Sequence, residues 1–106
     1  MDTFQALAEP RRREIVELLA KKGRLSATDI SENFSISAPA ISQHLKILRE
    51  AKLVDMEKHA QKRIYALNPD TISDIEEWIG KLRSLWSKRF ERLDSLLQKR
   101  GKHGRP

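Results

Sequence analysis

The feature that most restricts the fold of this chain is a pair of short helical patterns separated by about three residues. Two runs of alternating apolar and polar residues follow at once. Ser26 can cap a first helix over residues 26–34, and Ser37 can cap a second over residues 37–51. Apolar and polar side chains then alternate in the runs LVDMEKH and KRIYALN, which predict a β-hairpin over residues 54–67. A helix pair with a tight break and an attached hairpin leaves few arrangements for a small domain.

Helical patterns also lie on both sides of this unit. Apolar residues near the start of the chain mark a short helix that ends before Pro10, and residues 10–23 form another with that proline in its first turn. From Asp70 onward, apolar side chains recur at spacings of three and four, as in one long amphipathic helix. We therefore expect a mainly α domain over residues 1–97, in the order helix, helix, helix, helix, strand, strand, helix, and a disordered basic tail over residues 98–106.

The charge balance restricts the classes of partner. Lysine and arginine number 21 against 15 aspartates and glutamates, and the net charge of +6 favours a polyanion such as nucleic acid or an anionic membrane surface. The surplus lies in residues 37–67, with six basic side chains against three acidic ones, and in residues 98–106, with four against none. The 106 residues suit one domain and include no cysteine, no apolar run of membrane-spanning length and no signal segment, so we expect a cytoplasmic protein.

One side of the helix over residues 37–51 carries small and polar residues where charges usually solvate a surface. At about 100° per residue, Ile41, Leu45 and Leu48 share one side and can grip a core. The opposite side carries Pro39, Gln43, Lys46 and Glu50, flanked by Ala40 and Ser42. Glutamine can bond adenine, serine can donate to a base or phosphate, alanine contacts thymine methyls, and the N–H groups at Ser37 attract a phosphate. This helix is therefore suited to the major groove of DNA.

The tip of the predicted hairpin is basic. It carries Lys58, His59, Lys62 and Arg63, whereas Tyr65 is expected to pack inside the hairpin. The tip can contact the DNA backbone or enter the minor groove, and the alternative is a solvated turn whose charges prevent edge pairing. For the helix before it, the alternative is an ordinary amphipathic helix with an exposed polar side. Together the elements have the order of a winged helix-turn-helix with its wing over residues 54–67, which favours DNA binding.

The segments ALAEPRRREIVELL, SISAPAISQHLKILREAKLV and KRIYALNP resemble the ArsR-type family of bacterial winged-helix transcriptional repressors, over about residues 3–95. The resemblance implies a homodimer that binds an inverted-repeat operator on double-stranded DNA and is released by a signal. His44 occupies the histidine of the family motif, where packing and DNA contact both remain open. On the leading helix face we expect DNA contacts from Ser37, Ala38, Pro39, Ala40, Ser42, Gln43, His44 and Lys46.

Two turn positions and the metal ligands depart from the family pattern. Ser35 and Lys52 stand where the family often has glycine, so either both backbones avoid positive φ or the fold accepts a strain of about 1–2 kcal/mol per residue. Metal-sensing members use a Cys-x-Cys pair, or histidine and carboxylate ligands on the last helix. Here the first site reads TDIS, and the last helix has Asp74, Glu76 and Glu77 without a histidine. Transition metals normally need imidazole or thiolate, so we expect no metal and no other cofactor.

The apolar stripe after Asp70 is too long for one small domain to cover, and a second copy of the chain is the economical partner. We expect a dimer interface formed by Phe4, Leu7, Ile75, Ile79, Leu82, Trp86, Phe90 and Leu93. Trp78 and Trp86 would anchor this interface. The alternatives are that they form the walls of a small-molecule pocket, or that the stripe contacts another protein.

These expectations describe a metal-independent, homodimeric repressor that binds specific DNA sequences. The alternative is a winged-helix protein-interaction module without specific DNA binding, but such a module would more often carry a large apolar patch on its recognition face. Enzymatic activity is not indicated, because the sequence has no catalytic triad spacing, phosphate-binding glycine loop or metal set. A membrane-surface role for the tail lacks an accompanying basic amphipathic helix with an aromatic face.

Overall fold

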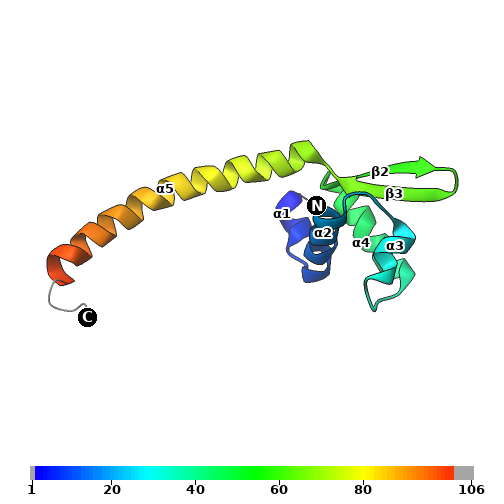
Figure 1. Cartoon of the computed structure of the whole chain (residues 1–106), viewed down its shortest axis with the longest axis horizontal. Helices are drawn as coiled ribbons and strands as arrows, with labels where there is room; N and C mark the ends of the chain where they lie inside the picture. Colours follow the sequence, from blue (N-terminus) through cyan, green and yellow to red (C-terminus); the bar gives the residue numbers. More distant parts are fainter. Residues whose placement is uncertain (1, 102–106) are drawn as a thin grey trace. The chain divides into compact units, whose positions relative to one another are not determined.

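The computed structural model describes the backbone of residues 2–101 and the side chains through residue 98. The chain forms two compact units, one through Ile72 and the other from Ser73 onward. The elements of the first unit are α1 (Thr3–Leu7), α2 (Pro10–Lys22), β1 (Leu25–Ser26), α3 (Ala27–Glu32), α4 (Ala38–Glu50), β2 (Val54–His59) and β3 (Lys62–Leu67) (Figure 1). The last helix, α5 (Pro69–Gly101), begins in the first unit and makes up the second. The winged helix-turn-helix predicted from the sequence is confirmed, with β1 as an addition.

The helices of the first unit begin at residues that satisfy free backbone N–H groups. Ser26 and Ser37, the two caps predicted from the sequence, each accept a hydrogen bond from the N–H three residues on, at 3.1 and 3.3 Å. At the start of α2 the carboxylate of Glu9 does the same for the N–H of Arg12, at 2.9 Å. These caps fix where α3 and α4 begin, and so determine which residues of α4 turn outward.

The core of the first unit is built mainly from aliphatic side chains. Its buried apolar residues are Ala6, Ile15, Leu19, Ile30, Ile41, Leu45, Leu48, Ala51, Leu53, Val54 and Tyr65. The side of α4 that was expected to grip the core is therefore buried, and α4 packs against α2, α3 and β2. The Arg12 guanidinium is also buried, and its Nε donates to the carbonyl of Ala6 at 2.6 Å, which joins α2 to α1.

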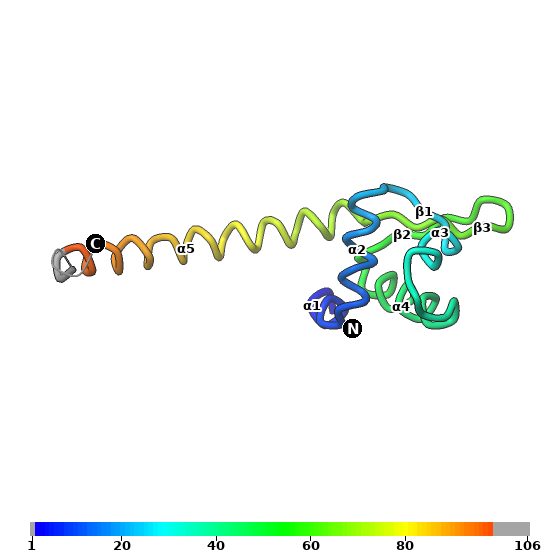
Figure 2. Tube along the Cα trace, turned by 60° about the horizontal axis from the view of Figure 1, so that its bottom comes forward, coloured from blue at the N-terminus to red at the C-terminus, as the bar shows by residue number. Residues whose placement is uncertain are grey.

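The sheet has the strand order β1-β3-β2 and is antiparallel throughout (Figure 2). In the hairpin, called the wing from here on (residues 54–67), the register runs from Val54 opposite Leu67 to His59 opposite Lys62. Leu25 of β1 pairs with Tyr65 on the other edge of β3. The sequence did not predict β1, because two residues are too few to show a strand periodicity.

Two non-glycine residues in the described chain have positive φ: Lys52 at 62°, in the turn after α4, and Ala60 at 57°, at the tip of the wing. Ser35 therefore avoids the left-handed region, whereas Lys52 occupies it. Of the two positions where the family often has glycine, only Lys52 carries the left-handed strain that the sequence left as one of two alternatives.

Replacing Lys52 with glycine is expected to stabilise the fold. Glycine removes a left-handed strain of about 1–2 kcal/mol but costs about 0.5–1 kcal/mol in chain entropy, so the free energy of unfolding should rise by about 0.5–1 kcal/mol. Urea denaturation would measure this. Lys52→Ala is the control, because it removes the same charge and keeps the Cβ atom. Equal stability of the two variants would contradict the strain.

The last helix is longer than its apolar pattern predicted. It begins at Pro69, where the Asn68 side chain accepts a hydrogen bond from the N–H of Thr71 at 3.0 Å, and continues to Gly101. The expected break after residue 97 is therefore absent, and the rest of the expected tail, residues 102–106, lies outside the described residues. Among the described helices, α5 included, none combines the length and apolar character needed to cross a membrane.

Candidate nucleic-acid interface

The outward side of α4 is open to solvent, as the sequence predicted. Of the residues expected to contact DNA, those exposed on or just before this helix are Ser37, Ala38, Pro39, Ser42, Gln43 and Lys46. Ala40 and His44 are half-buried. Gln43 and Lys46 thus extend from a rigid helix whose opposite side is fixed in the core, so their positions are set by the fold.

The start of α4 offers fewer backbone donors than a helix N-terminus usually does. The N–H of Ala40 is bonded to the Ser37 hydroxyl, the N–H of Ile41 is bonded to the Ser37 carbonyl at 3.1 Å, and Pro39 has no N–H. The Ala38 N–H is left as the donor available to a phosphate. The sequence predicted that the N–H groups at the helix start near Ser37 would attract a phosphate, and those of Ala40 and Ile41 are already engaged.

A groove of about 320 Å³ lies between α4 and β3. It is lined by Pro39, Ser42, Gln43, Lys46, Arg49, Arg63 and Tyr65. Arg49 was not among the DNA contacts predicted from the sequence, although its spacing of seven from Ser42 puts the two residues on the same side of the helix. Tyr65 is 5% exposed and forms part of the core of the wing, as expected, with an edge in the groove.

The three cations of this groove have no acidic partner. The ion pairs found among the described side chains involve Arg11, Arg24 and His59, and none of them includes Lys46, Arg49 or Arg63. Unpaired cations from two elements therefore converge on one concave surface. Such a surface attracts an anion, and the phosphates of a DNA backbone are anions that suit it.

The register of the wing places its cations on two different faces. Lys58 pairs with Arg63 and lies two residues from Met56, which pairs with the buried Tyr65, so these residues share the face toward the groove. His59 pairs with Lys62, on the opposite face. The four basic residues predicted at the tip therefore do not form one cluster.

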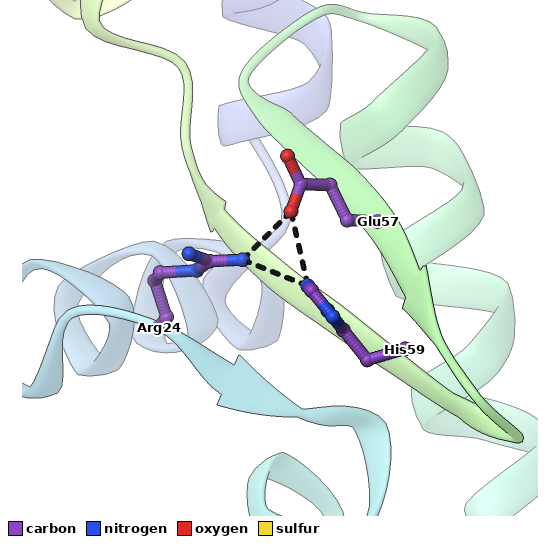
Figure 3. Close-up of polar contacts among 3 residues, drawn as sticks. All are labelled: Arg24, Glu57 and His59. Atoms are coloured by element: carbon purple, nitrogen blue, oxygen red, sulfur yellow. Dashed lines mark hydrogen bonds and ion pairs between the residues drawn. The ribbon is translucent and has the colours of Figure 1, made fainter.

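The outer face of the wing carries a polar network of three side chains (Figure 3). Arg24 Nη2 lies 2.8 Å from Glu57 Oε2 and 3.3 Å from His59 Nε2, and this His59 nitrogen lies 3.2 Å from the same Glu57 oxygen. The hydrogen bond with His59 and the positive charge of Arg24 lower the pKa of Glu57, which keeps it ionised. The sequence placed His59 among the DNA contacts, whereas its imidazole is held by Glu57. Neither Arg24 nor Glu57 was singled out.

His44 lies on the flank of α4 rather than on its open side. It is half-buried, and its Nδ1 atom is shielded from solvent with no hydrogen-bond partner among the described residues. Burial raises the pKa of the nearby Glu9, but the hydrogen bond from the Arg12 N–H and the electrostatic influence of His44 outweigh it, so that pKa is lowered. The geometry favours packing between α4 and the start of α2 over direct DNA contact.

The residues predicted for a dimer interface are mostly exposed. Phe4 of α1 is 53% exposed, and Leu7 is half-buried. On α5, Ile75 is half-buried, and the exposed members of the stripe are Ile79, Leu82, Trp86, Phe90 and Leu93. Trp86 packs edge-on against Phe90, with ring centroids 5.2 Å apart. A shallow apolar hollow of about 440 Å³ is lined by Ile79, Leu82, Arg83 and Trp86.

In the described part of the chain, no three His, Cys, Asp or Glu side chains are placed to hold a metal ion.

Comparison with known proteins agrees with this geometry. Residues 9–56 match the family model described as "Bacterial regulatory protein, arsR family". The chain is similar to the transcriptional repressor SdpR of Bacillus subtilis (strain 168), at 40% identity over 74% of this chain and 86% of that protein. It is also similar to the HTH-type transcriptional regulator Rv2034 of Mycobacterium tuberculosis, at 34% identity over 92% and 88%. Among solved structures, a possible transcriptional regulator for arsenical resistance superposes with a TM-score of 0.70, at 34% identity over 90% and 95%.

Proposed function

The chain belongs to the ArsR family of bacterial transcriptional regulators, and from that membership we propose that it is a cytoplasmic, homodimeric repressor that binds an inverted-repeat operator through α4 and the wing. Members of this family are DNA-binding regulators and not enzymes. The observation that carries the proposal is the open side of α4. Gln43 and Lys46 are exposed there, and the groove at this surface is lined by Lys46, Arg49 and Arg63, none of which has an acidic partner among the described side chains.

The proposed mechanism divides the interface into positioning and base recognition. Lys46, Arg49 and Arg63 would hold the phosphate backbone, which fixes where α4 lies in the major groove. Gln43 lines the same groove and can form two hydrogen bonds with one adenine. Ser42 and Pro39 at the same surface are small enough to allow close approach. Affinity would then come from the cations and sequence preference from Gln43.

We expect Gln43→Ala to relax specificity at one base pair of each half-site. Losing a bidentate contact costs about 1–3 kcal/mol of discrimination, so the preferred base and its replacements should bind almost equally well there. Competition binding with operators substituted at single positions measures this. Arg63→Ala is the comparison, because removal of a phosphate contact should weaken all these operators alike. Unchanged discrimination in Gln43→Ala would exclude Gln43 as a base contact.

The second part of the proposal is a dimer formed through α5, with Phe4 and Leu7 of α1 contributing. Five large apolar side chains of the stripe are about half exposed or more, which is unusual for a surface that stays in water. The hollow on α5 has the spacing of a coiled-coil hole, since its residues stand at positions i, i+3, i+4 and i+7. A large side chain from a second copy of α5 would fill it.

The charges along α5 favour an antiparallel pair of these helices. Residues 70–77 carry four acidic side chains and no basic one, whereas residues 81–94 carry five basic side chains against the two acidic ones of Glu91 and Asp94. An antiparallel pair centred near Arg83 places the acidic segment of each copy along the basic segment of the other. A parallel pair would place like charges together. A two-fold axis across the helices also suits a two-fold operator.

Metal independence is also part of the proposal. The chain has no cysteine, and α5 offers carboxylates without imidazole through residue 98, so the ligands that transition metals prefer are lacking. Operator affinity should therefore be the same with a chelator as with added Zn²⁺. A change of tenfold or more in either direction would contradict this.

Selection of genomic fragments by the purified protein tests the proposed function as a whole. We expect enrichment of an inverted repeat whose half-sites lie about 34–36 Å apart, or a multiple of that spacing, because two copies of α4 must enter successive grooves on one side of the DNA. Binding should weaken with salt, with a slope of about −0.9 for each phosphate neutralised. Recovery of fragments without any shared motif would refute specific recognition.

A further inference from the structure

The arginines on the two faces of the wing differ in whether they form an ion pair. On the face toward the groove, Arg63 has no acidic partner within the part of the chain whose side chains are described. On the outer face, Arg24 reaches from the residue before β1 to the far strand β2, where Glu57 holds it at 2.8 Å (Figure 3). Because β3 lies between β1 and β2 in the sheet, this pair spans the middle strand. Arg24 and Glu57 remain well exposed, at 58% and 65% of their side chains, so the pair is accessible to a partner.

We propose that Glu57 is a specificity-determining residue that keeps Arg24 from binding DNA phosphates and so confines DNA contact by the wing to its groove face. This inference rests on the proposed DNA-binding function. Glu57 itself would touch no base. It acts by holding the Arg24 guanidinium and by placing a negative charge on the outer face of the wing.

The physical reason lies in how non-specific affinity arises. A free guanidinium near the interface can contact a phosphate of any DNA sequence, and each such contact strengthens binding by releasing a counterion. A carboxylate that holds the guanidinium removes that contact and repels phosphates from the outer face. Specific binding through α4 would lose little, since the groove cations are on the other face. Specificity often depends on a repulsive element of this kind.

Asp55 provides a matched control on the same strand. It lies two residues from Glu57, so the two carboxylates share a face of β2, and both are exposed. Asp55 accepts hydrogen bonds from the Asn68 side-chain amide at 3.0 and 3.3 Å and holds no cation in the described structure. Asp55→Asn therefore removes the same charge as Glu57→Gln without releasing an arginine.

The experiment measures binding of the full-length protein to operator duplex and to a scrambled duplex across a series of salt concentrations. For Glu57→Gln, the slope of log affinity against log salt on scrambled DNA should steepen by about 0.9, one released counterion, relative to wild type and to Asp55→Asn. The ratio of operator to scrambled affinity should fall accordingly. Adding Arg24→Gln to Glu57→Gln should restore the wild-type slope.

Two outcomes would overturn the inference. If Glu57→Gln and Asp55→Asn had equal slopes, the effect would come only from the lost negative charge. If Glu57→Gln bound scrambled DNA more weakly than wild type, the Arg24–Glu57 pair would stabilise the wing rather than restrain Arg24. Failure of the proposed function would look different, because wild-type protein would then not prefer its operator over scrambled DNA.

Discussion

Trp86→Asp is expected to separate the dimer into monomers and, as a consequence, to abolish tight operator binding. Trp86 is 60% exposed on α5 and borders the apolar hollow that we assign to a second copy of the chain. Truncating a central aromatic anchor typically costs about 2–4 kcal/mol, which corresponds to about a 30- to 1000-fold weaker dimer. A buried aspartate adds a further penalty. Analytical ultracentrifugation at micromolar concentration would detect the shift in mass.

Ser84→Asp is the matched control for this change. It adds the same charge two residues earlier, but about 160° around the helix from Trp86. Both positions are exposed and lie in the second unit, so neither change should unfold the first unit. We expect Ser84→Asp to remain dimeric. A dimer that survives Trp86→Asp with unchanged affinity would show that the apolar side of α5 is not the interface.

Replacing all three groove cations with glutamine should remove most of the salt dependence of operator binding. Lys46, Arg49 and Arg63 line one groove, form no ion pair with any side chain through residue 98, and are each expected to neutralise one phosphate. At about 0.9 for each contact, the slope should become shallower by about 2.7 for each protomer's half-site, and affinity at low salt should fall by orders of magnitude. Fluorescence anisotropy over a salt series gives both values.

The control for the groove variant changes the same charge elsewhere. Lys21, Lys22 and Lys52 are exposed and do not border the groove, and their replacement by glutamine lowers the net charge equally. If the two triple variants had the same slope, net charge would explain the binding and the groove would have no special part. A loss confined to the groove variant would establish where the DNA backbone lies.

Much of the interface followed from local patterns in the sequence. The helical period was enough to separate the buried side of α4, with Leu45, from the open side, with Gln43, because a helix of thirteen residues has little freedom in how it rotates. The alternating runs located the wing correctly. Its register then placed Lys58 with Arg63 on one face, a relation that can be derived only once the strand pairing is known.

What the sequence could not predict depends on contacts between distant residues. Arg24 and Glu57 are 33 positions apart, and nothing in the spacing of either residue indicates that they meet across β3. The left-handed backbone at Lys52 was left open because a lysine is compatible with either conformation. The length of α5 was underestimated because a basic, glycine-containing end can continue a helix when the preceding turns are already formed.

The central claim is that the open side of α4 contacts DNA, and amide chemical-shift mapping tests it most directly. Isotope-labelled protein would be titrated with the operator recovered by fragment selection. We predict the largest shifts at Ala38, Gln43 and Lys46 of α4 and at Arg63 of the wing, with small shifts at the exposed Ser84 of α5. Large shifts confined to α5, with α4 unchanged at saturating DNA, would contradict the account.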